Sequence, residues 1–405
     1  MMISEELASE ECWNEFYEYR AVTRHMPASE RRDLRSFIDE KRYLPYAEAL
    51  SSCALELPEP ARREISKNSG PGKRVVYLYE GDDLIFLKML AYRLSVKYDS
   101  LLRSNCYAFR RDTGACDAVR RIRNDSDIRR LFGLKTDLHD YFNSIPPESL
   151  MEKLSFLGRE DGDVYEFLRK MLIPADLQCK KTGSVHRGVM AGTPTSAFLA
   201  NVYLSDLDAY FEKENVRYFR YSDDILIFAE DRDALHRLEA ELNERISGAG
   251  LCFNASKRME ISPGEAFVFL GFSFSEGRVG MSEHSISKIK GRIRRKARAL
   301  RRWAEKKNLP GDRAAKGFIG AMNRKFFDDG EEGEFSWSRW FFPNLTSGDD
   351  LKEIDEYMRK YARFCVTGRH YKGNYRISYE TLKEWGFRSL VAEYYASKSL
   401  ANAPR

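Results

Sequence analysis

The segment Tyr221-Ser222-Asp223-Asp224 constrains this chain more than any other, because it joins two runs that are typical of β-strands. Apolar and aromatic residues dominate both the preceding run, 216–220, and the following run, 225–229. Two such runs with a short polar connection predict a β-hairpin with an acidic turn. Neighbouring carboxylates repel each other, and their oxygens are the ligands that hard divalent cations prefer. The sequence therefore predicts a metal site at this turn if a third carboxylate approaches it.

Asp137 is the candidate for that third carboxylate. It lies near the end of a predicted strand over 131–138, and an aromatic pair, Tyr141 and Phe142, follows it. An acid at a strand end and an acid pair at a hairpin tip could converge on one sheet. Three carboxylates can share two divalent ions about 4 Å apart, which activate a hydroxyl and hold a triphosphate. The three aspartates thus predict metal-assisted phosphoryl transfer.

Length and composition limit the classes of protein to consider. With 405 residues, the chain can form two or three domains or one large multi-lobed unit. The net charge is only +5, so a nucleic-acid interaction must rest on local clusters of cations. Seven cysteines without a C-x-x-C pair argue against a zinc site or a disulfide framework and for reduced thiols. Without a long apolar run or a signal-peptide core, we expect a soluble cytoplasmic protein with no membrane partner.

Periodicity and turn residues predict the order of elements along the chain. The predicted helices cover residues 1 to about 65, 82–102, 196–210 and 232–247, and the predicted strands cover 73–79, 131–138 and 267–274. The acidic hairpin over 216–229 completes the set.

The order of these motifs resembles that of the reverse transcriptases, especially the bacterial group II intron-like lineage. The likeness covers about residues 70–280 well and the remainder more loosely. It rests on a first catalytic motif at 137–146, a glycine-bearing loop and helix at 188–204, the Tyr-x-Asp-Asp box at 221–224, a lysine-bearing motif at 251–257, a primer-gripping hairpin at 269–272 and a fingers-like segment at 105–119. Each match alone is weak, but six in the right order and spacing are specific.

The resemblance implies an α+β right-hand polymerase fold, with an antiparallel palm sheet and a helical thumb. It divides the chain into an N-terminal helical extension (1–70), fingers and palm (71–280), and a basic thumb with a C-terminal segment (281–405). The implied activity is that of an RNA-directed DNA polymerase with two Mg²⁺ ions, for which Mn²⁺ could substitute. Its partners would be template RNA, a DNA primer or cDNA product, and dNTPs.

The resemblance also assigns roles to single residues. The implied metal ligands are the carboxylates of Asp137, Asp223 and Asp224 and the backbone carbonyl of Leu138. In the nucleotide site, Phe142 would exclude the ribose 2′-hydroxyl, Gly192 would lie in the nucleotide-binding loop, and Lys257 would protonate the leaving pyrophosphate. Lys73 and Arg74 would hold the incoming triphosphate, since a guanidinium suits bidentate contacts with phosphate.

A basic segment lies where the family places its thumb, and Glu305 is the only acid among the cations of residues 288–307. Such a helix would track the phosphate backbone of a primer–template duplex, through contacts that carry little sequence information. The candidate contacts are Lys288, Arg292, Arg295, Arg298 and Arg302.

Each feature has a simpler explanation on its own. An Asp-Asp pair is common in turns, and a basic helix is often only a solvated face. Phe142 could belong to the core, Arg74 could be an edge-strand charge, and Lys257 could be an exposed lysine at the end of an element. The sequence also departs from the family at Ala191, where many relatives have Gln, so that a contact with the nucleotide must be absent or supplied by another group. Ser222 replaces the Ala or Met of many relatives, and a small residue suits a tight turn.

The C-terminal residues narrow the resemblance. Val366-Thr367-Gly368 resembles a short motif of retron enzymes, whereas 379–395 looks more like the stand-alone bacterial reverse transcriptases linked to phage defence. Members of that group often copy a structured noncoding RNA encoded next to them. We therefore expect cDNA synthesis on a cognate noncoding RNA in phage defence, with a retron-type or intron-derived enzyme as the alternative. An RNA-binding, maturase-like protein is the competing class, favoured by the basic helix and by Ala191.

Overall fold

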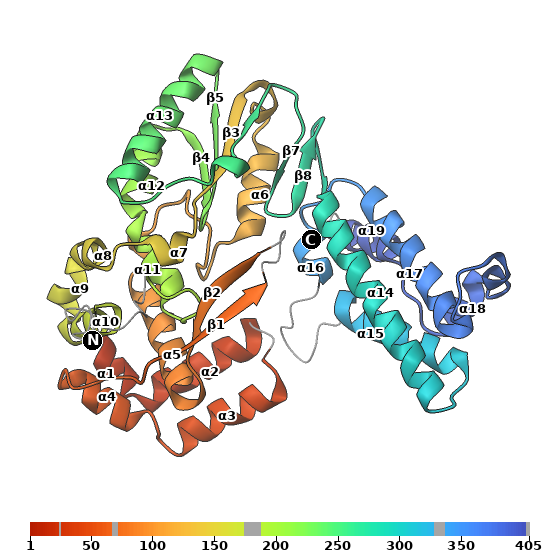
Figure 1. Cartoon of the computed structure of the whole chain (residues 1–405), viewed down its shortest axis with the longest axis horizontal. Coiled ribbons are helices and arrows are strands. Elements are labelled where there is room, and N and C mark those ends of the chain that lie inside the picture. The colour runs from red at the N-terminus through yellow and green to blue at the C-terminus, as the bar shows by residue number, and fades with distance from the viewer. Residues whose placement is uncertain (24–25, 67–71, 174–187, 328–336, 402–405) are drawn as a thin grey trace. The chain divides into compact units, whose positions relative to one another are not determined.

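The computed structural model describes residues 1–23, 26–66, 72–173, 188–327 and 337–401. The chain forms two compact units (Figure 1). The first contains residues 1–20, 26–118 and 130–263, and the second contains residues 21–25, 119–129 and 264–405. Both units combine helices with antiparallel sheet, which confirms the predicted α+β fold.

A four-stranded antiparallel sheet organises the first unit, in the order β4-β5-β3-β6. Its strands are β3 (Phe132–Asp137), β4 (Arg217–Tyr221), β5 (Asp224–Ala229) and β6 (Met259–Ile261). The predicted acidic hairpin is confirmed, because β4 and β5 pair with Tyr221 opposite Asp224. Residues 225–229 are all buried, so both faces of β5 are covered. Helix α13 (Arg232–Gly248), which confirms another prediction, packs on β3 and β5.

Helices and a second hairpin complete the first unit. The further helices are α1 (Ile3–Leu7), α2 (Glu10–Thr23), α3 (Ala28–Asp39), α4 (Leu44–Ser51), α5 (Gly81–Lys97), α7 (Tyr141–Ser144), α8 (Pro147–Lys153), α9 (Ser155–Glu160), α10 (Gly162–Leu172), α11 (Ser196–Tyr203) and α12 (Ser205–Lys213). Trp13 anchors the N-terminal helices, since its fully buried ring lies 5.1 Å from that of Phe37 and 5.4 Å from that of Tyr43.

Two predictions of secondary structure are wrong in this unit. Residues 61–66, expected to be helical up to about residue 65, form strand β1 (Ala61–Ser66), because they pair with β2 (Lys73–Leu78) in an antiparallel hairpin. The single helix expected over 196–210 is interrupted at Leu204, between α11 and α12. The Ser205 hydroxyl donates a hydrogen bond of 2.8 Å to the Val202 carbonyl oxygen, a local bond that competes with continued helix.

The second unit contains a three-stranded sheet and a group of helices. The strands are β7 (Phe267–Phe269), β8 (Phe272–Ser275) and β9 (Arg278–Met281), and the helices are α14 (Glu283–Lys306), α15 (Gly311–Phe327), α16 (Trp337–Phe341), α17 (Asp349–Thr367), α18 (Tyr379–Glu384) and α19 (Leu390–Ala401). Helix α6 (Ala115–Asn124) contributes residues to both units. The single strand expected over 267–274 is wrong, but the hairpin that the resemblance implies at 269–272 is confirmed, because Leu270 and Gly271 take φ angles of 51° and 85° and reverse the chain.

Helices α14, α15 and α17 pack pairwise against one another. Among the helices described, none has the length and apolar character needed to cross a membrane. The division into an N-terminal extension, fingers with palm, and thumb stays a prediction.

Candidate active site

The register of the central strands brings the three predicted aspartates together. Asp137, the last residue of β3, lies directly opposite Asp224, the first residue of β5. Side chains opposite each other in an antiparallel pair have Cβ atoms about 5 Å apart. Asp223 precedes Asp224 in the turn, and its carbonyl oxygen accepts a hydrogen bond of 3.1 Å from the Leu138 amide. The three aspartates and Leu138 are therefore neighbours, while their binding of metal stays a prediction.

Burial and mutual repulsion make this cluster unfavourable when it is fully ionised. Burial and, after it, the charges of Asp137 and Asp224 together raise the pKa of Asp223 from its ordinary value to about 7. Burial also raises the pKa of Asp224, and the Lys135 ammonium opposes that shift. A divalent cation among the oxygens would compensate for these charges, which is a common reason for clustering carboxylates.

Lys257 supplies positive charge at the same site. It follows an isolated β-bridge between Leu138 and Phe253, and its ammonium forms a salt bridge with the Asp137 carboxylate. Within the described ranges, no group of three His, Cys, Asp or Glu side chains is arranged so that it could hold a metal ion. Asp137 is instead bonded to Lys257 and to Asp223. The predicted donors are nevertheless all oxygens, three carboxylates and one backbone carbonyl, and such a set fits Mg²⁺ or Mn²⁺.

Arg220 stabilises the turn that carries Asp223, a role that the sequence did not reveal. Arg220 is fully buried, and its guanidinium forms a bidentate salt bridge with the equally buried Asp208 of α12, in which Nε lies 2.7 Å from Oδ1. The same guanidinium donates to the Ser222 carbonyl oxygen at 3.3 Å and to the Cys106 sulfur at 3.1 Å. Ser222 itself takes a φ of 61°, which is rare for a non-glycine residue. The buried pair thus fixes a strained turn to α12 and to the segment around Cys106.

The glycine-bearing loop after residue 187 contacts both Phe142 and the β1-β2 hairpin. A Cβ on Gly188 would lie 2.1 Å from the Phe142 carbonyl oxygen, and one on Gly192 would lie 2.9 Å from the Tyr77 carbonyl oxygen. Gly192 also has a φ of 105°, so a side chain there is excluded both by space and by backbone conformation. The Phe142 ring is partly buried and meets that of Phe109 edge-on at 6.2 Å. The loop therefore packs on Phe142 through Gly188 and on Tyr77 through Gly192, while a nucleotide pocket formed by Phe142 and Gly192 stays a prediction.

Lys73 and Arg74 lie on β2, which pairs with β1. Both are exposed, and Lys73 pairs with Glu64 of β1 at 3.2 Å. In the described residues, neither cation forms a salt bridge with the three aspartates. Their contact with a triphosphate stays a prediction.

The five predicted nucleic-acid-binding cations all lie on α14 and are all exposed. Ile286, Ile289 and Ile293 form its buried stripe. Four of the cations recur at helical spacing and lie on the exposed side away from this stripe. They are Lys288, Arg292, Arg295 and Arg302. Arg298 is exposed as well, and its charge lowers the pKa of His370.

Comparison with known proteins gives the family. Residues 65–274, about half of the chain, match the family described as reverse transcriptase (RNA-dependent DNA polymerase). The Retron Ec83 reverse transcriptase of Escherichia coli is 34% identical over 106 residues, which are 25% of this chain and 33% of that protein. The match thus spans about a third of the curated relative's length.

Two telomerase structures are also similar to this chain. Telomerase from Candida albicans in complex with the TWJ fragment of telomeric RNA has a TM-score of 0.44 at 14% identity, covering 90% of this chain and 70% of that one. Apo telomerase from Candida tropicalis has a TM-score of 0.44 at 14% identity, covering 82% and 69%. The family match, which covers just over half of the residues, is the decisive comparison, and this chain belongs to the reverse transcriptase (RNA-dependent DNA polymerase) family.

Proposed function

We propose that this protein is an RNA-directed DNA polymerase that extends a DNA primer with dNTPs on an RNA template. The observation that carries the proposal is the register of β3 and β5, which sets Asp137 opposite Asp224 and beside Asp223 in a chain of this family. A protein that only bound RNA would have no need to gather three mutually repelling carboxylates.

The chain's own groups suggest how the reaction would proceed. Asp137, Asp223, Asp224 and the Leu138 carbonyl would hold two Mg²⁺ ions, with Mn²⁺ as a substitute. When bound, these ions would favour ionisation of the primer 3′-hydroxyl and neutralise the triphosphate. Arg74 and Lys73 would bind the triphosphate from the fingers hairpin. Lys257, beside Asp137, would donate a proton to the departing pyrophosphate.

Replacing Phe142 with alanine should relax discrimination against ribonucleotides by roughly ten- to a hundredfold, because a steric gate rejects the 2′-hydroxyl by volume alone. The measurement is the ratio of kcat/KM for a dNTP to that for the matching rNTP. Phe156→Ala is the control, since Phe156 is also partly buried but packs on Tyr98 at 4.9 Å. An unchanged ratio in Phe142→Ala would show that Phe142 is only part of the core.

Arg295→Ala should lower the slope of log Kd against log salt concentration by about one unit, because one phosphate contact releases about one counterion. The slope is measured with a primer–template duplex. Arg169→Ala removes the same charge from an exposed pair with Glu166 on α10 and should leave the slope unchanged. Equal slopes for wild type and Arg295→Ala would exclude Arg295 as a phosphate contact.

We also propose a narrower role, namely that the protein copies a structured noncoding RNA encoded beside it, in the cytoplasm and in phage defence. The resemblance of residues 379–395 supports the defence role, and the six cysteines described are all free, as in a reducing compartment. A retron-type enzyme is the second candidate, favoured by the partial match to a retron reverse transcriptase and by Val366-Thr367-Gly368.

Sequencing the RNA and DNA that co-purify with the protein from its host tests the proposal. The expected result is one enriched RNA together with DNA complementary to part of it. DNA joined to a retained piece of that RNA would favour the retron-type candidate. An enriched RNA without complementary DNA would favour the maturase-like alternative.

A further inference from the structure

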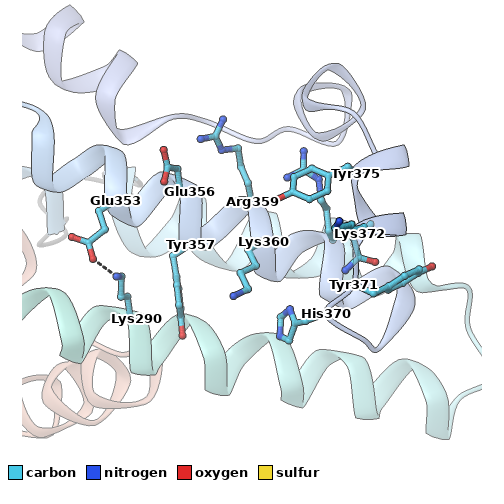
Figure 2. Close-up of a pocket in the computed structure, with 12 residues that line it drawn as sticks. Lys290, Glu353, Glu356, Tyr357, Arg359, Lys360, His370, Tyr371, Lys372 and Tyr375 are labelled. Carbon is cyan, nitrogen blue, oxygen red and sulfur yellow. Dashed lines mark hydrogen bonds and ion pairs between the residues drawn. The ribbon is translucent and has the colours of Figure 1, made fainter.

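A groove runs between α14, α17 and the loop after α17 in the second unit (Figure 2). It consists of two cavities, of about 470 and 720 Å³, that share Lys290, Glu353 and Tyr357 as lining residues. Figure 2 shows Tyr357 and Lys360 extending from α17 toward α14. Because the two cavities adjoin, the groove is elongated and suits an extended ligand better than a compact one.

The groove carries an excess of positive charge. Its lining cations are Lys290, Arg294, Arg359, Lys360, Arg363 and Lys372, and its lining acids are Glu283, Glu353 and Glu356. Of these cations, only Lys290 forms a salt bridge within the described part of the chain, with Glu353. Burial and the neighbouring Arg359 lower the pKa of Arg363, and burial, Lys360 and Arg298 lower that of His370. A groove whose lining cations outnumber its acids in this way attracts a polyanion.

Aromatic rings stand exposed among these cations. Tyr371 is 50% exposed and Tyr375 is 75% exposed, although large aromatic side chains gain little from contact with water. The Arg363 guanidinium lies 5.2 Å from the centre of the Tyr375 ring. The loop that presents the rings is well fixed, since Asn374 accepts a hydrogen bond of 2.8 Å from the Thr367 hydroxyl and donates one of 2.7 Å to the Arg369 carbonyl oxygen.

We propose that this groove binds a single-stranded stretch of nucleic acid, with its phosphates along the cations and its bases stacked on Tyr371 and Tyr375. Cations interleaved with exposed rings are the usual means of holding unpaired bases, whereas a duplex hides its bases from such rings. The groove also lies on another side of α14 than Lys288, Arg292 and Arg295. The site goes beyond the proposed polymerase activity, because it would hold a strand whether or not the chain extends a primer.

Fluorescence anisotropy with single strands of about 12 nucleotides tests the groove. The double substitution Tyr371→Ala/Tyr375→Ala should weaken binding of a single strand by roughly ten- to a hundredfold. Tyr395→Ala, which removes a ring that is 55% exposed but lies outside the groove, should leave it unchanged. Lys372→Ala should weaken binding and reduce its salt dependence, whereas Lys352→Ala, on the same unit but outside the groove lining, should do neither.

Binding of RNA and DNA strands of the same sequence is compared to show which nucleic acid the groove takes. A preference for either one supports the proposed binding site. Equal affinity of wild type and the double tyrosine variant would overturn the proposal, as would a mononucleotide that binds as tightly as the strand. Thermal melting of the variants confirms that they fold. Primer extension by wild type is measured separately. If wild type extends a primer but the double tyrosine variant binds the strand normally, only the proposed groove is wrong. If the variant binds the strand more weakly but wild type does not extend a primer, only the polymerase proposal is wrong.

Discussion

Asp223→Asn should reduce RNA-templated primer extension by at least roughly 1,000-fold, because it removes a carboxylate ligand of the two proposed metal ions. Those ions would stabilise the transition state of nucleotide addition. The amide is almost the same size as the carboxylate, so the change removes charge rather than volume. Asp137→Asn should cost a similar factor, and the double variant should be little worse than either alone, since the aspartates act as one unit. The measurement is the single-turnover rate of nucleotide addition.

Glu230→Gln is the matched control, because Glu230 is an exposed carboxylate just beyond the other end of β5. It should extend the primer at the wild-type rate. Binding of template RNA by Asp223→Asn should remain, which separates chemistry from recognition. A normal rate in Asp223→Asn would mean that the metal assignment is wrong, and normal biological activity in that variant would favour the maturase-like alternative.

Arg220→Ala should lower the free energy of unfolding of the first unit by about 3–5 kcal/mol, because it leaves the Asp208 carboxylate fully buried and unpaired. Denaturant unfolding measures this effect. Arg169→Ala breaks an exposed salt bridge with Glu166 and should cost no more than about 1 kcal/mol. Equal costs for the two substitutions would contradict the account of the buried pair.

A second variant separates stability from positioning of the turn. Replacing both partners, in Arg220→Met/Asp208→Leu, should restore much of the stability, since apolar residues of similar volume often replace a buried ion pair at little cost. Primer extension should stay low, because nothing then donates to the Ser222 carbonyl oxygen. Wild-type extension in this stable double variant would show that Arg220 does not position the turn.

Local patterns predicted the parts of the fold that place the three aspartates. Apolar runs mark the hairpin β4-β5 and strand β3, and helical spacing of apolar residues marks α13; each was predicted close to its observed bounds. Together with membership of the family, the four-stranded antiparallel sheet confirms the right-hand polymerase fold. The sequence could predict that Asp137 lies near Asp223 and Asp224, because a strand end and a hairpin tip commonly lie at the same edge of a sheet.

Long-range pairing explains what the sequence did not reveal. Arg220 stands inside an apolar strand, where the pattern gives no sign that Asp208 of another element neutralises it. Strand β1 is exposed throughout, so it lacks the alternation that marks a half-buried strand. The groove is formed partly by the loop over residues 370–375. This loop lies beside Lys290 and Arg294 of α14, although about 80 residues of sequence separate them. No local period connects such distant segments.

The most direct test of the central claim is extension of a DNA primer on a defined RNA template by the purified protein, with dNTPs and Mg²⁺, followed by sequencing of the product. The account predicts DNA complementary to the template, made only when the divalent ion is present and lost on chelation. A folded protein that binds the primer–template but adds no nucleotide, or that adds nucleotides without regard to the template, would contradict it.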